Sequence, residues 1–508
     1  MTPISLDTSP YWSTSATFPP FAKLNSDARA DVVVVGGGVT GLTAAYLLAE
    51  AGRSVLLVER GRCAATDTGH TSAHLTMVTD TRLGELVKRF GRPHAQAVWD
   101  AGLSAMAQID GIVRRHQIDC GFDWVEGYLH APPDAKDAGA VESLKLEADL
   151  AGELGFDAAF QDAVPLVGTA GIRFEGQARI HPRKYLAGMA KALAAAGGRI
   201  HENTEATEFS TDPLSVTANG HRVTCNDVVI ATHNPLVGVG GVTGATLFQT
   251  KLALYTSYVV AGRVPKSTVP DSLWWDTASP YRYLRVEPHR AYDLVILGGE
   301  DHKTGQASDT EACYDRLARA IVALAPGIEI THRWSGQVIE TPDGLPYIGS
   351  TADHQYSATG YAGNGLTFGT LAGTMVTDRI LGRPNPWTEL FDPARKAIRH
   401  GVWDYLKENA DYPYYLIRDR FAGAAGRSLR SVKRGQGKII ERDGTKVAAY
   451  RDEAGAVTMR SATCTHMACL VAWNSAEKTW DCPCHGSRFT PAGEVISGPA
   501  ESPLPAID

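Results

Sequence analysis

The stretch Asp31-Val-Val-Val-Val-Gly-Gly-Gly-Val-Thr-Gly41 decides how the N-terminal part of this 508-residue chain folds. Its four consecutive valines predict a buried strand, and the glycines after them predict a tight turn into a helix over residues 42–51. A second apolar run, residues 54–58, ends at Glu59 and completes a strand, helix, strand unit. Residues 32–49 carry no charge, but their glycines argue against a membrane-spanning helix.

The glycine spacing in this unit predicts a dinucleotide site. Glycines at the first, third and sixth positions allow a tight turn, and they let backbone N–H groups and the N-terminus of the helix face a pyrophosphate. The carboxylate at the end of the second strand is placed to accept hydrogen bonds from ribose hydroxyls. The expected contacts are Gly36, Gly38, Val39, Thr40, Gly41, Glu59 and Arg60. This pattern alone leaves FAD and NAD as alternatives.

Three later segments resemble one family of FAD enzymes. Ile230-Ala-Thr232, residues 341–349 (TPDGLPYIG) and residues 360–369 (GYAGNGLTFG) are similar to segments of the D-amino-acid-oxidase-like oxidoreductases, which include glycine and sarcosine oxidases and glutamylputrescine oxidoreductase. The resemblance covers about residues 30–385 and implies FAD as the cofactor.

The same resemblance implies where the flavin lies. Backbone N–H groups of Gly363, Asn364, Gly365 and Leu366 would stabilise the negative charge of the reduced pyrimidine ring. Thr232 would also contact the cofactor, Ala206 would meet the adenine, and Thr71, Ser72 and Ala73 would line the isoalloxazine. His70 lies near the point where some relatives attach flavin covalently, but its surroundings do not match theirs, which favours an ordinary polar loop histidine.

The C-terminal region predicts a metal cluster. Cys464-Thr-His466 and Cys482-Pro-Cys484-His485 are separated by 15 residues, and each loop offers one thiolate and one imidazole. A Rieske [2Fe–2S] cluster needs two cysteines on one iron and two histidines on the other. The alternative is a structural zinc site, although zinc fingers usually pair cysteine with cysteine and histidine with histidine.

Similarity to the cytochrome-bc-type Rieske proteins adds three expectations. It implies a disulfide between Cys469 and Cys484 that joins the two cluster loops, and a hydroxyl donor to a cluster sulfur at Ser487. Phe489 occupies the position where high-potential relatives have tyrosine. Loss of that hydroxyl is expected to lower the reduction potential.

We therefore expect an α/β Rossmann-like FAD-binding domain with an inserted α+β substrate domain, followed by an all-β Rieske domain. The length suggests about three folding units. The predicted ranges are a leader at 1–29, the FAD-dependent oxidoreductase at 30–385, a connector at 386–425 and the Rieske domain at 426–508. Within the oxidoreductase we assign about 30–81, 171–245 and 331–385 to FAD binding, and about 82–170 and 246–330 to the substrate domain.

The sequence offers several candidates for substrate chemistry, namely Tyr255, Tyr258, Trp274, Trp275, Tyr281, Arg282, Tyr283 and residues 300–303 (Glu-Asp-His-Lys), of which we select three. Arg282 could hold a substrate carboxylate, His302 could handle a proton or tune the flavin, and Tyr255 could line the substrate site. Each has an ordinary alternative, namely an exposed strand arginine, a solvated turn histidine and a core aromatic residue. Flavin oxidation of an amine depends mainly on positioning and on exclusion of water, so no acid–base pair is obligatory.

The expected function is oxidation of a C–N bond in a small amine or amino acid, with electrons passing from FAD to the cluster and then to an external acceptor. The alternative is a protein that transfers or senses electrons through a partner protein. Rieske oxygenase chemistry is disfavoured because no convincing two-histidine, one-carboxylate iron site is present. The net charge of −7 argues against nucleic acid, and the absence of a signal peptide predicts a cytoplasmic protein. The substrate, acceptor and oligomeric state stay open.

Overall fold

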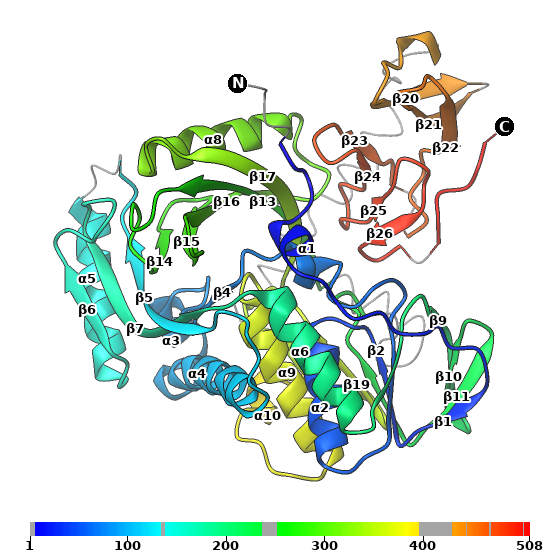
Figure 1. The fold of residues 1–508 in the computed structure, drawn as a ribbon, viewed down its shortest axis with the longest axis horizontal. Coiled ribbons are helices and arrows are strands. Elements are labelled where there is room, and N and C mark those ends of the chain that lie inside the picture. The colour runs from blue at the N-terminus through cyan, green and yellow to red at the C-terminus, as the bar shows by residue number, and fades with distance from the viewer. Residues whose placement is uncertain are drawn as a thin grey trace.

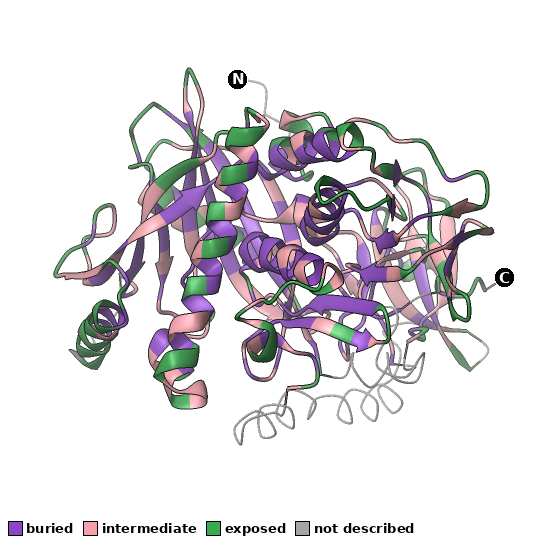
Figure 2. Cartoon of the chain, turned by 90° about the horizontal axis from the view of Figure 1, so that it is seen from below, coloured by how far each residue is buried: buried purple, intermediate pink, exposed green. Residues whose placement is uncertain are grey.

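The computed structural model describes residues 6–133, 138–235, 251–395, 429–442, 444–466, 469–500 and 502–507. Two sheets of the N-terminal part lie beside each other, and the small C-terminal part packs against both (Figure 1). The elements at the centre are mostly buried, and the exposed residues lie on outer helix faces and loops (Figure 2). No helix among the described residues is long and apolar enough to cross a membrane.

The first sheet has six strands in the order β18-β19-β12-β2-β3-β8. It is parallel except for its edge strand β18, which pairs antiparallel with β19. The bounds are β2 (Val32–Val35), β3 (Val55–Val58), β8 (Arg199–His201), β12 (Asp227–Ile230), β18 (Tyr347–Ala352) and β19 (Gln355–Thr359). This confirms the Rossmann-like fold expected from the valine run and its glycine turn.

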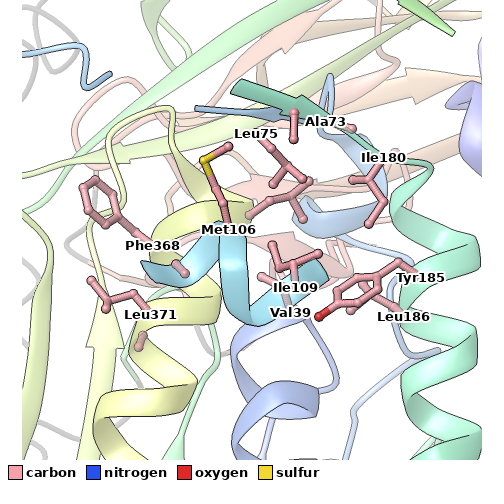
Figure 3. Close-up of a cluster of buried hydrophobic side chains, with 14 of the residues drawn as sticks. Val39, Ala73, Leu75, Met106, Ile109, Ile180, Tyr185, Leu186, Phe368 and Leu371 are labelled. Atoms are coloured by element: carbon pink, nitrogen blue, oxygen red, sulfur yellow. The ribbon is translucent and has the colours of Figure 1, made fainter. Parts of the chain in front are cut away.

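The valines of β2 alternate between two cores, because successive side chains of a strand point to opposite faces. Val32 and Val34 join a cluster under helices α2 (Val39–Glu50), α6 (Pro182–Ala195) and α9 (Gly365–Ile380), where Val39 and Phe368 also lie (Figure 3). Val33 and Val35 face a four-stranded sheet that covers the other side. That sheet consists of β1 (Ala28–Arg29), β9 (Ala206–Thr211), β10 (Leu214–Ala218) and β11 (His221–Thr224).

The second large sheet has nine strands and forms the inserted domain. Its order is β17-β13-β16-β15-β14-β5-β7-β4, with β6 paired to β7. The bounds are β4 (His74–Leu75), β5 (Asp123–His130), β6 (Ala158–Gln161), β7 (Gly171–Arg179), β13 (Ala253–Val264), β14 (Leu273–Asp276), β15 (Tyr283–Pro288), β16 (Asp293–Lys303) and β17 (Glu329–Glu340). The accompanying helices are α3 (Leu83–Phe90), α4 (Arg92–Arg115), α5 (Ala138–Glu153) and α8 (Glu311–Leu324).

Three strands differ from the ranges expected for this domain. The structure places β4, β7 and β17 in the nine-stranded sheet, whereas the sequence analysis assigned β4, β7 and most of β17 to the FAD-binding segments 30–81, 171–245 and 331–385. The reason is pairing: β7 runs antiparallel to β5, and β17 runs antiparallel to β13 along nearly its whole length. Where the chain passes from one sheet to the other, the next strand pairs with strands of the new sheet. Hydrophobic patterning predicts a strand but does not show to which sheet the strand belongs.

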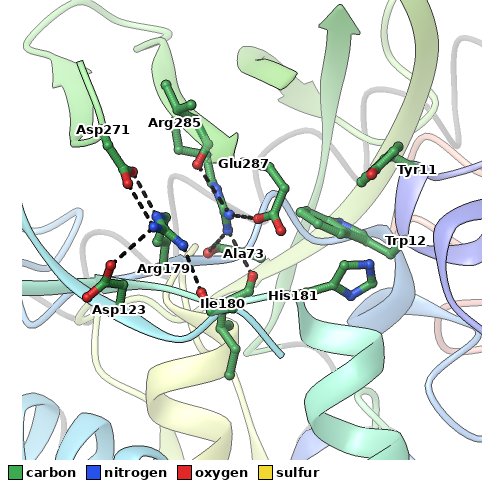
Figure 4. Close-up of polar contacts among 12 residues, drawn as sticks. Tyr11, Trp12, Ala73, Asp123, Arg179, Ile180, His181, Asp271, Arg285 and Glu287 are labelled. Atoms are coloured by element: carbon green, nitrogen blue, oxygen red, sulfur yellow. Dashed lines mark hydrogen bonds and ion pairs between the residues drawn. The ribbon is translucent and has the colours of Figure 1, made fainter. Parts of the chain in front are cut away.

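The described part of the leader is anchored in the fold. Helix α1 (Tyr11–Ser15) buries Trp12 completely, and the Trp12 indole N–H donates to the Thr71 carbonyl oxygen at 2.6 Å. Figure 4 shows Trp12 next to the buried ion pair of Arg285 with Glu287. The N-terminal segment therefore supports the loop on which Thr71 lies.

The C-terminal part is all β, as expected. One sheet comprises β20 (Gln436–Arg442), β21 (Thr445–Arg451) and β22 (Val457–Ser461). The other comprises β23 (Ala472–Asn474), β24 (Thr479–Asp481), β25 (Arg488–Phe489) and β26 (Val495–Ser497). Of the predicted connector, α10 (Thr388–Phe391) is described, whereas residues 396–425 lie outside the described residues.

Candidate functional site

A cavity of about 930 Å³ lies between the six-stranded and nine-stranded sheets. Its lining contains nearly all of the predicted cofactor contacts: Gly36, Gly38, Val39, Thr40, Glu59, Arg60, Thr71, Ser72, Ala206, Thr232, Gly363, Asn364, Gly365 and Leu366. Segments that are far apart in sequence thus converge on one volume. Gly41 and Ala73 are the two predicted contacts that lie outside the lining.

Gly41 and Ala73 support the backbone of residues that line the cavity. A Cβ atom on Gly41 would lie 1.9 Å from the Gly36 carbonyl oxygen, so only glycine permits this turn. The Ala73 carbonyl oxygen accepts a hydrogen bond from Arg285 Nη1 at 2.7 Å (Figure 4). Arg285 is fully buried and also donates to the Ile180 carbonyl oxygen at 3.0 Å. This arginine therefore fixes the backbone behind Thr71 and Ser72.

Three observations indicate that the cavity fits FAD. Gly36 has φ +109°, and a Cβ there would lie 2.4 Å from the Ala231 carbonyl oxygen, so the turn at the start of α2 needs glycine. Glu59 accepts backbone N–H groups from Gly37 at 2.7 Å and Gly61 at 2.8 Å, which orients its carboxylate at the cavity edge. At Gly365, where α9 begins, a Cβ would meet nothing within 4 Å, so a ring can approach that helix N-terminus closely.

The part of the cavity formed by the nine-stranded sheet is acidic and aromatic. The Tyr281 hydroxyl donates to Asp80 Oδ2 at 3.0 Å, and the hydroxyls of Ser257 and Tyr283 are hydrogen-bonded at 2.7 Å. Asp301 also lines the cavity, and its buried Oδ1 has no hydrogen-bond partner among the described residues. Asp80 borders the open cavity and lies beside Gly363, where a Cβ would come within 2.5 Å of Asp80 Oδ2.

Desolvation by the surrounding protein shifts the pKa of these carboxyl groups, although the Asp80 side chain is exposed to the open cavity. Desolvation raises the pKa of Asp80 to about 7, and the Tyr281 hydroxyl partly opposes the rise. Desolvation likewise raises the pKa of Asp301 to about 6. Both groups therefore change charge near neutral pH, in contrast to surface aspartates.

The three candidates for substrate chemistry lie outside the cavity lining. The Nδ1 atom of His302 lies 2.8 Å from the Lys303 carbonyl oxygen, and its Nε2 atom lies 3.0 Å from the Tyr258 hydroxyl. These contacts direct the ring toward the C-terminal part. Arg282 forms an ion pair with Glu300 at 2.9 Å. Tyr255 lies on β13 opposite Val338 and Lys303. Their roles in substrate chemistry stay predictions that the geometry does not favour.

Asp80 was not predicted from the sequence because nothing in its local sequence distinguishes it, whereas Tyr281 and Asp301 belonged to the wider set of candidates but were not among the three selected. Asp80 lies in a loop after β4, whereas Asp301 lies on β16 and Tyr281 precedes β15. The Asp80–Tyr281 contact joins residues 201 positions apart. The sequence signal for this part of the site was Gly298-Gly299 before the acidic pair Glu300-Asp301. This pattern indicates an unusual strand, but the sequence analysis assigned its chemistry to His302.

The four predicted cluster ligands converge in the C-terminal part. The rings of His466 and His485 lie 4.9 Å apart, and the thiols of Cys464 and Cys482 are close enough to interact. Both ring nitrogens of His466 are buried and lack hydrogen-bond partners among the described residues. Unpaired buried imidazole nitrogens beside two thiols fit a metal cluster, because such nitrogens otherwise cost free energy.

The predicted disulfide is present. Cys469 and Cys484 are joined by an S–S bond of 2.06 Å and connect the two cluster loops. The Ser487 hydroxyl oxygen accepts the Ala500 N–H at 3.1 Å, which leaves the Ser487 hydroxyl hydrogen available for a cluster sulfur. Phe489 is completely buried.

The C-terminal part also forms one wall of the flavin cavity. Residues Ile496, Ser497, Gly498, Ala500 and Ser502 belong to the lining, and Arg60 Nη2 donates to the Ile496 carbonyl oxygen at 3.0 Å. A second, smaller cavity has Asp80, Tyr281 and Ala362 on one side and the cluster loop Pro483–Gly486 on the other. The two cofactor sites are therefore neighbours.

The fold and the two sites define a flavin-dependent oxidoreductase that carries an iron–sulfur module. The chain belongs to the FAD dependent oxidoreductase family (DAO), which it matches over residues 31–379, and residues 427–508 match the Rieske [2Fe-2S] domain. It is 34% identical over 508 residues to YhfW of Bacillus subtilis (strain 168), whose name describes a Rieske 2Fe-2S iron-sulfur protein; the match covers 98% of this chain and 97% of YhfW.

Two further relatives match the N-terminal part. Gamma-glutamylputrescine oxidoreductase of Escherichia coli (strain K12) is 26% identical over 389 residues, which cover 74% of this chain and 89% of that enzyme. The crystal structure of glycine oxidase from Geobacillus kaustophilus superposes with a TM-score of 0.58 at 19% identity and covers 73% of this chain and 99% of the oxidase. The chain is thus an FAD-dependent oxidoreductase with an additional Rieske domain.

Proposed function

We propose that this protein is a dehydrogenase of small amines. The observation that carries the proposal is that residues of both parts line one cavity, so the FAD site and the cluster site share a wall. When bound, FAD would supply a two-electron acceptor: the substrate ammonium group would lose one proton to water, its α-carbon would give up a hydride to the flavin to leave an iminium product, and the [2Fe–2S] cluster would pass the two electrons singly to an external one-electron acceptor.

The polar groups of the cavity favour a cationic amine over an amino acid. Asp80 and Asp301 face the cavity, and either carboxylate can pair with a substrate ammonium group when ionised. Arg82 also lines the cavity, close to Asp80 in the sequence. Its guanidinium group already pairs with the Glu147 carboxylate at 3.5 Å and donates to the Ser143 hydroxyl. Arg282, the sequence candidate for binding a carboxylate, is engaged by Glu300.

The chain's own residues would position the substrate and exclude water. Tyr281, Tyr283 and Trp275 supply the aromatic walls. Ile496, Ser497, Gly498, Ala500 and Ser502 cover the cavity from the side of the Rieske domain. Enclosure of this kind strengthens every polar contact inside the cavity. A cytoplasmic location stays a prediction.

Anaerobic titration of the purified protein with matched substrates tests the proposal. The panel contains alkylamines, diamines and the corresponding α-amino acids, and both flavin bleaching and the electron-paramagnetic signal of the reduced cluster are recorded. We expect amines to bleach the flavin and the cluster signal to follow. Bleaching by amino acids alone would contradict the substrate class. Flavin that stays oxidised with every compound would favour the alternative of an electron carrier for a protein partner.

A further inference from the structure

Strand β16 contains a bulge beside the flavin cavity. The register of its pairing with β13 shifts between Thr256 and Tyr258. Ser257 therefore lies alone opposite two residues of β16, Glu300 and Asp301. Glu300 has φ +60°, a left-handed conformation that residues other than glycine rarely adopt. A bulge changes the direction in which a side chain points, and such irregularities are frequent next to active sites.

Two arginines hold this bulge in place. Glu300 forms an ion pair with Arg282 at 2.9 Å and another with Arg316 at 2.5 Å. Arg282 directly precedes β15, whereas Arg316 belongs to α8, so the bulge is tied to two other elements. The residue after Glu300 is Asp301, which lines the flavin cavity together with Ser257. The bulge thus presents the Asp301 carboxyl to the cavity.

A chain of hydroxyl groups extends from Asp301 along the cavity wall. The Ser257 hydroxyl is hydrogen-bonded to the Asp301 carboxyl, and it lies 2.7 Å from the Tyr283 hydroxyl. Tyr283 is hydrogen-bonded in turn to Ser72. All four residues line the cavity. Asp301 Oδ1 is buried and has no hydrogen-bond partner among the described residues, which is unfavourable unless a bound group or a proton satisfies it.

The hydroxyl chain is compatible with both charge states of Asp301. Each hydroxyl group has one hydrogen and can both donate and accept. When Asp301 is ionised, Ser257 donates to it and accepts from Tyr283. When Asp301 is protonated, it can donate to Ser257, and Tyr283 can donate to Ser72 instead. Every hydroxyl of the chain keeps a partner in both states, so Asp301 can gain and lose a proton without a change in the fold.

The groups around Asp301 favour a proton exchange near neutral pH. The titratable groups that face it are Asp80 from the loop after β4, Tyr281 and Tyr283 at β15, and Glu300 on its own strand. Desolvation raises the pKa of Asp301 to about 6; the charge of Glu300 adds to the rise, and the Ser257 hydroxyl opposes it. Asp301 also raises the pKa of Asp80, so the two carboxyl groups together favour a bound cation.

We propose that Asp301 is the catalytic base of the amine oxidation and takes one proton from the substrate ammonium group. This inference rests on the proposed function and names the group through which that proton reaches water. An N–H bond of the ammonium group breaks and an O–H bond forms on Asp301. The freed nitrogen lone pair then forms the C=N bond as the α-carbon gives up its hydride to the flavin. Asp301 passes its proton to water, the external acceptor receives the two electrons singly, and the hydride proton also goes to water.

Kinetics of flavin bleaching separate a base from a group that only binds the cation. Full-length protein with both cofactors is mixed anaerobically with the amine of the panel that bleaches the native flavin fastest. We expect Asp301→Asn to lower the limiting rate at saturating amine about a hundredfold at pH 7. The slowing should shrink as the pH approaches the pKa of the ammonium group, because the free amine needs no base. Asp80→Asn, the matched loss of the other cavity carboxyl, should change mainly the amine concentration that gives half the limiting rate.

Infrared pH titration of the oxidised protein tests the assignment without a substrate. A protonated carboxyl group has a C=O band that disappears on ionisation. The native protein should lose such a band with a midpoint near pH 6, and Asp301→Asn should lack it. Ser257→Ala should move the midpoint to higher pH, because the Ser257 hydroxyl lowers the pKa of Asp301. Ser350→Ala is the matched control: it removes a hydroxyl that donates to the Ala352 carbonyl oxygen outside the cavity lining, and it should leave the midpoint in place.

The outcomes distinguish this inference from the proposed function. A native limiting rate in Asp301→Asn, or a slowing that persists at high pH, would overturn the inference. Absence of an Asp301-dependent carboxyl band between about pH 4 and pH 8 would also overturn it. Native flavin that no amine of the panel bleaches would overturn the proposed function instead. Thermal midpoint and iron content identify a variant that does not fold; Ser257→Ala then serves as the test and should shift the infrared midpoint and the pH profile of the limiting rate together.

Discussion

At the scale of single residues, the proposed role of Asp80 predicts that substrate binding depends on pH. Its pKa of about 7 means that the carboxyl is neutral below that pH and ionised above it. A small amine with a pKa near that of lysine stays cationic through this range. We therefore expect kcat/KM for a cationic amine to rise as the pH increases through about 7. In Asp80→Asn, the rise should vanish, and KM at pH 8 should increase roughly tenfold because a hydrogen bond to a charged group is lost.

The substitution Tyr281→Phe tests whether Asp80 is the titrating group, because it should shift the midpoint of the pH profile in a known direction. The Tyr281 hydroxyl lowers the pKa of Asp80, so its removal should move the midpoint of the profile to higher pH. Tyr255→Phe, a change outside the cavity lining, should leave the midpoint in place. A midpoint unchanged in both Asp80→Asn and Tyr281→Phe would assign the titration to another group.

The hydroxyl of Ser487 is expected to tune the cluster. Hydrogen bonds to cluster sulfurs favour the reduced state, so Ser487→Ala should lower the reduction potential by roughly 60 mV, a tenfold change for a one-electron couple. Phe489→Tyr should change the potential in the opposite direction, because it restores the hydroxyl of the high-potential relatives. Protein-film voltammetry measures both values. Equal potentials in the three proteins would exclude this source of tuning.

The predicted residues that the structure brings together are those whose pattern is local in the sequence. Glycine spacing after Val35 and the pairing of cysteine with histidine in two loops depend on neighbours along the chain, which a sequence shows directly. Asp80 and Gln337 depend on long-range packing: the Gln337 Nε2 donates to the Gly486 carbonyl oxygen because β17 pairs with β13 in one particular alignment. Long-range register leaves no mark in a single sequence, so these residues could be found only in the structure.

At the scale of secondary-structure elements, helix α1 is held by three neutral histidines. Tyr11 pairs with His289 at 2.8 Å, Thr14 with His332 at 3.3 Å and Ser15 with His181 at 3.0 Å. Burial lowers the pKa of all three rings, that of His181 to about 3. Asp7 opposes the shift at His332, whereas nearby cationic side chains reinforce it at His181 and His289.

The sign of the resulting pH dependence follows from these lowered pKa values. Above about pH 6.5 the histidines are neutral in both docked and undocked states, so docking of α1 is complete. Below that pH the undocked rings gain protons first, so docking weakens progressively toward pH 3. Hydrogen exchange of residues 11–15, corrected for intrinsic rates, should show lower protection at pH 5 than at pH 7, while α8 keeps its protection. Equal protection of α1 at both pH values would contradict the assignment.

At the scale of the whole molecule, the Rieske domain is part of the FAD site. Ile496, Ser497, Gly498, Ala500 and Ser502 line the flavin cavity. Two of them are bonded to the cluster loops: Thr465 Oγ1 donates to the Ser502 carbonyl oxygen at 2.6 Å, and the Ala500 N–H donates to Ser487. Thr465 lies between the predicted ligands Cys464 and His466. The arrangement around one cluster loop should therefore affect how tightly the other domain retains FAD.

Thr465→Val tests this coupling in the full-length chain. The substitution keeps the shape of the side chain and removes its donor to Ser502, so the wall of the cavity loses one anchor while Arg60 still holds Ile496. Loss of about 1 kcal/mol of hydrogen-bond energy should weaken FAD binding roughly fivefold, as measured by flavin fluorescence during titration of the apoprotein. Thr268→Val, which removes a hydroxyl bonded to Pro265 in an exposed turn, is the matched control and should bind FAD like the native chain. If Thr465→Val keeps its iron and binds FAD with native affinity, the prediction is wrong: the contact between the cluster loop and the cavity wall would then not contribute to FAD binding.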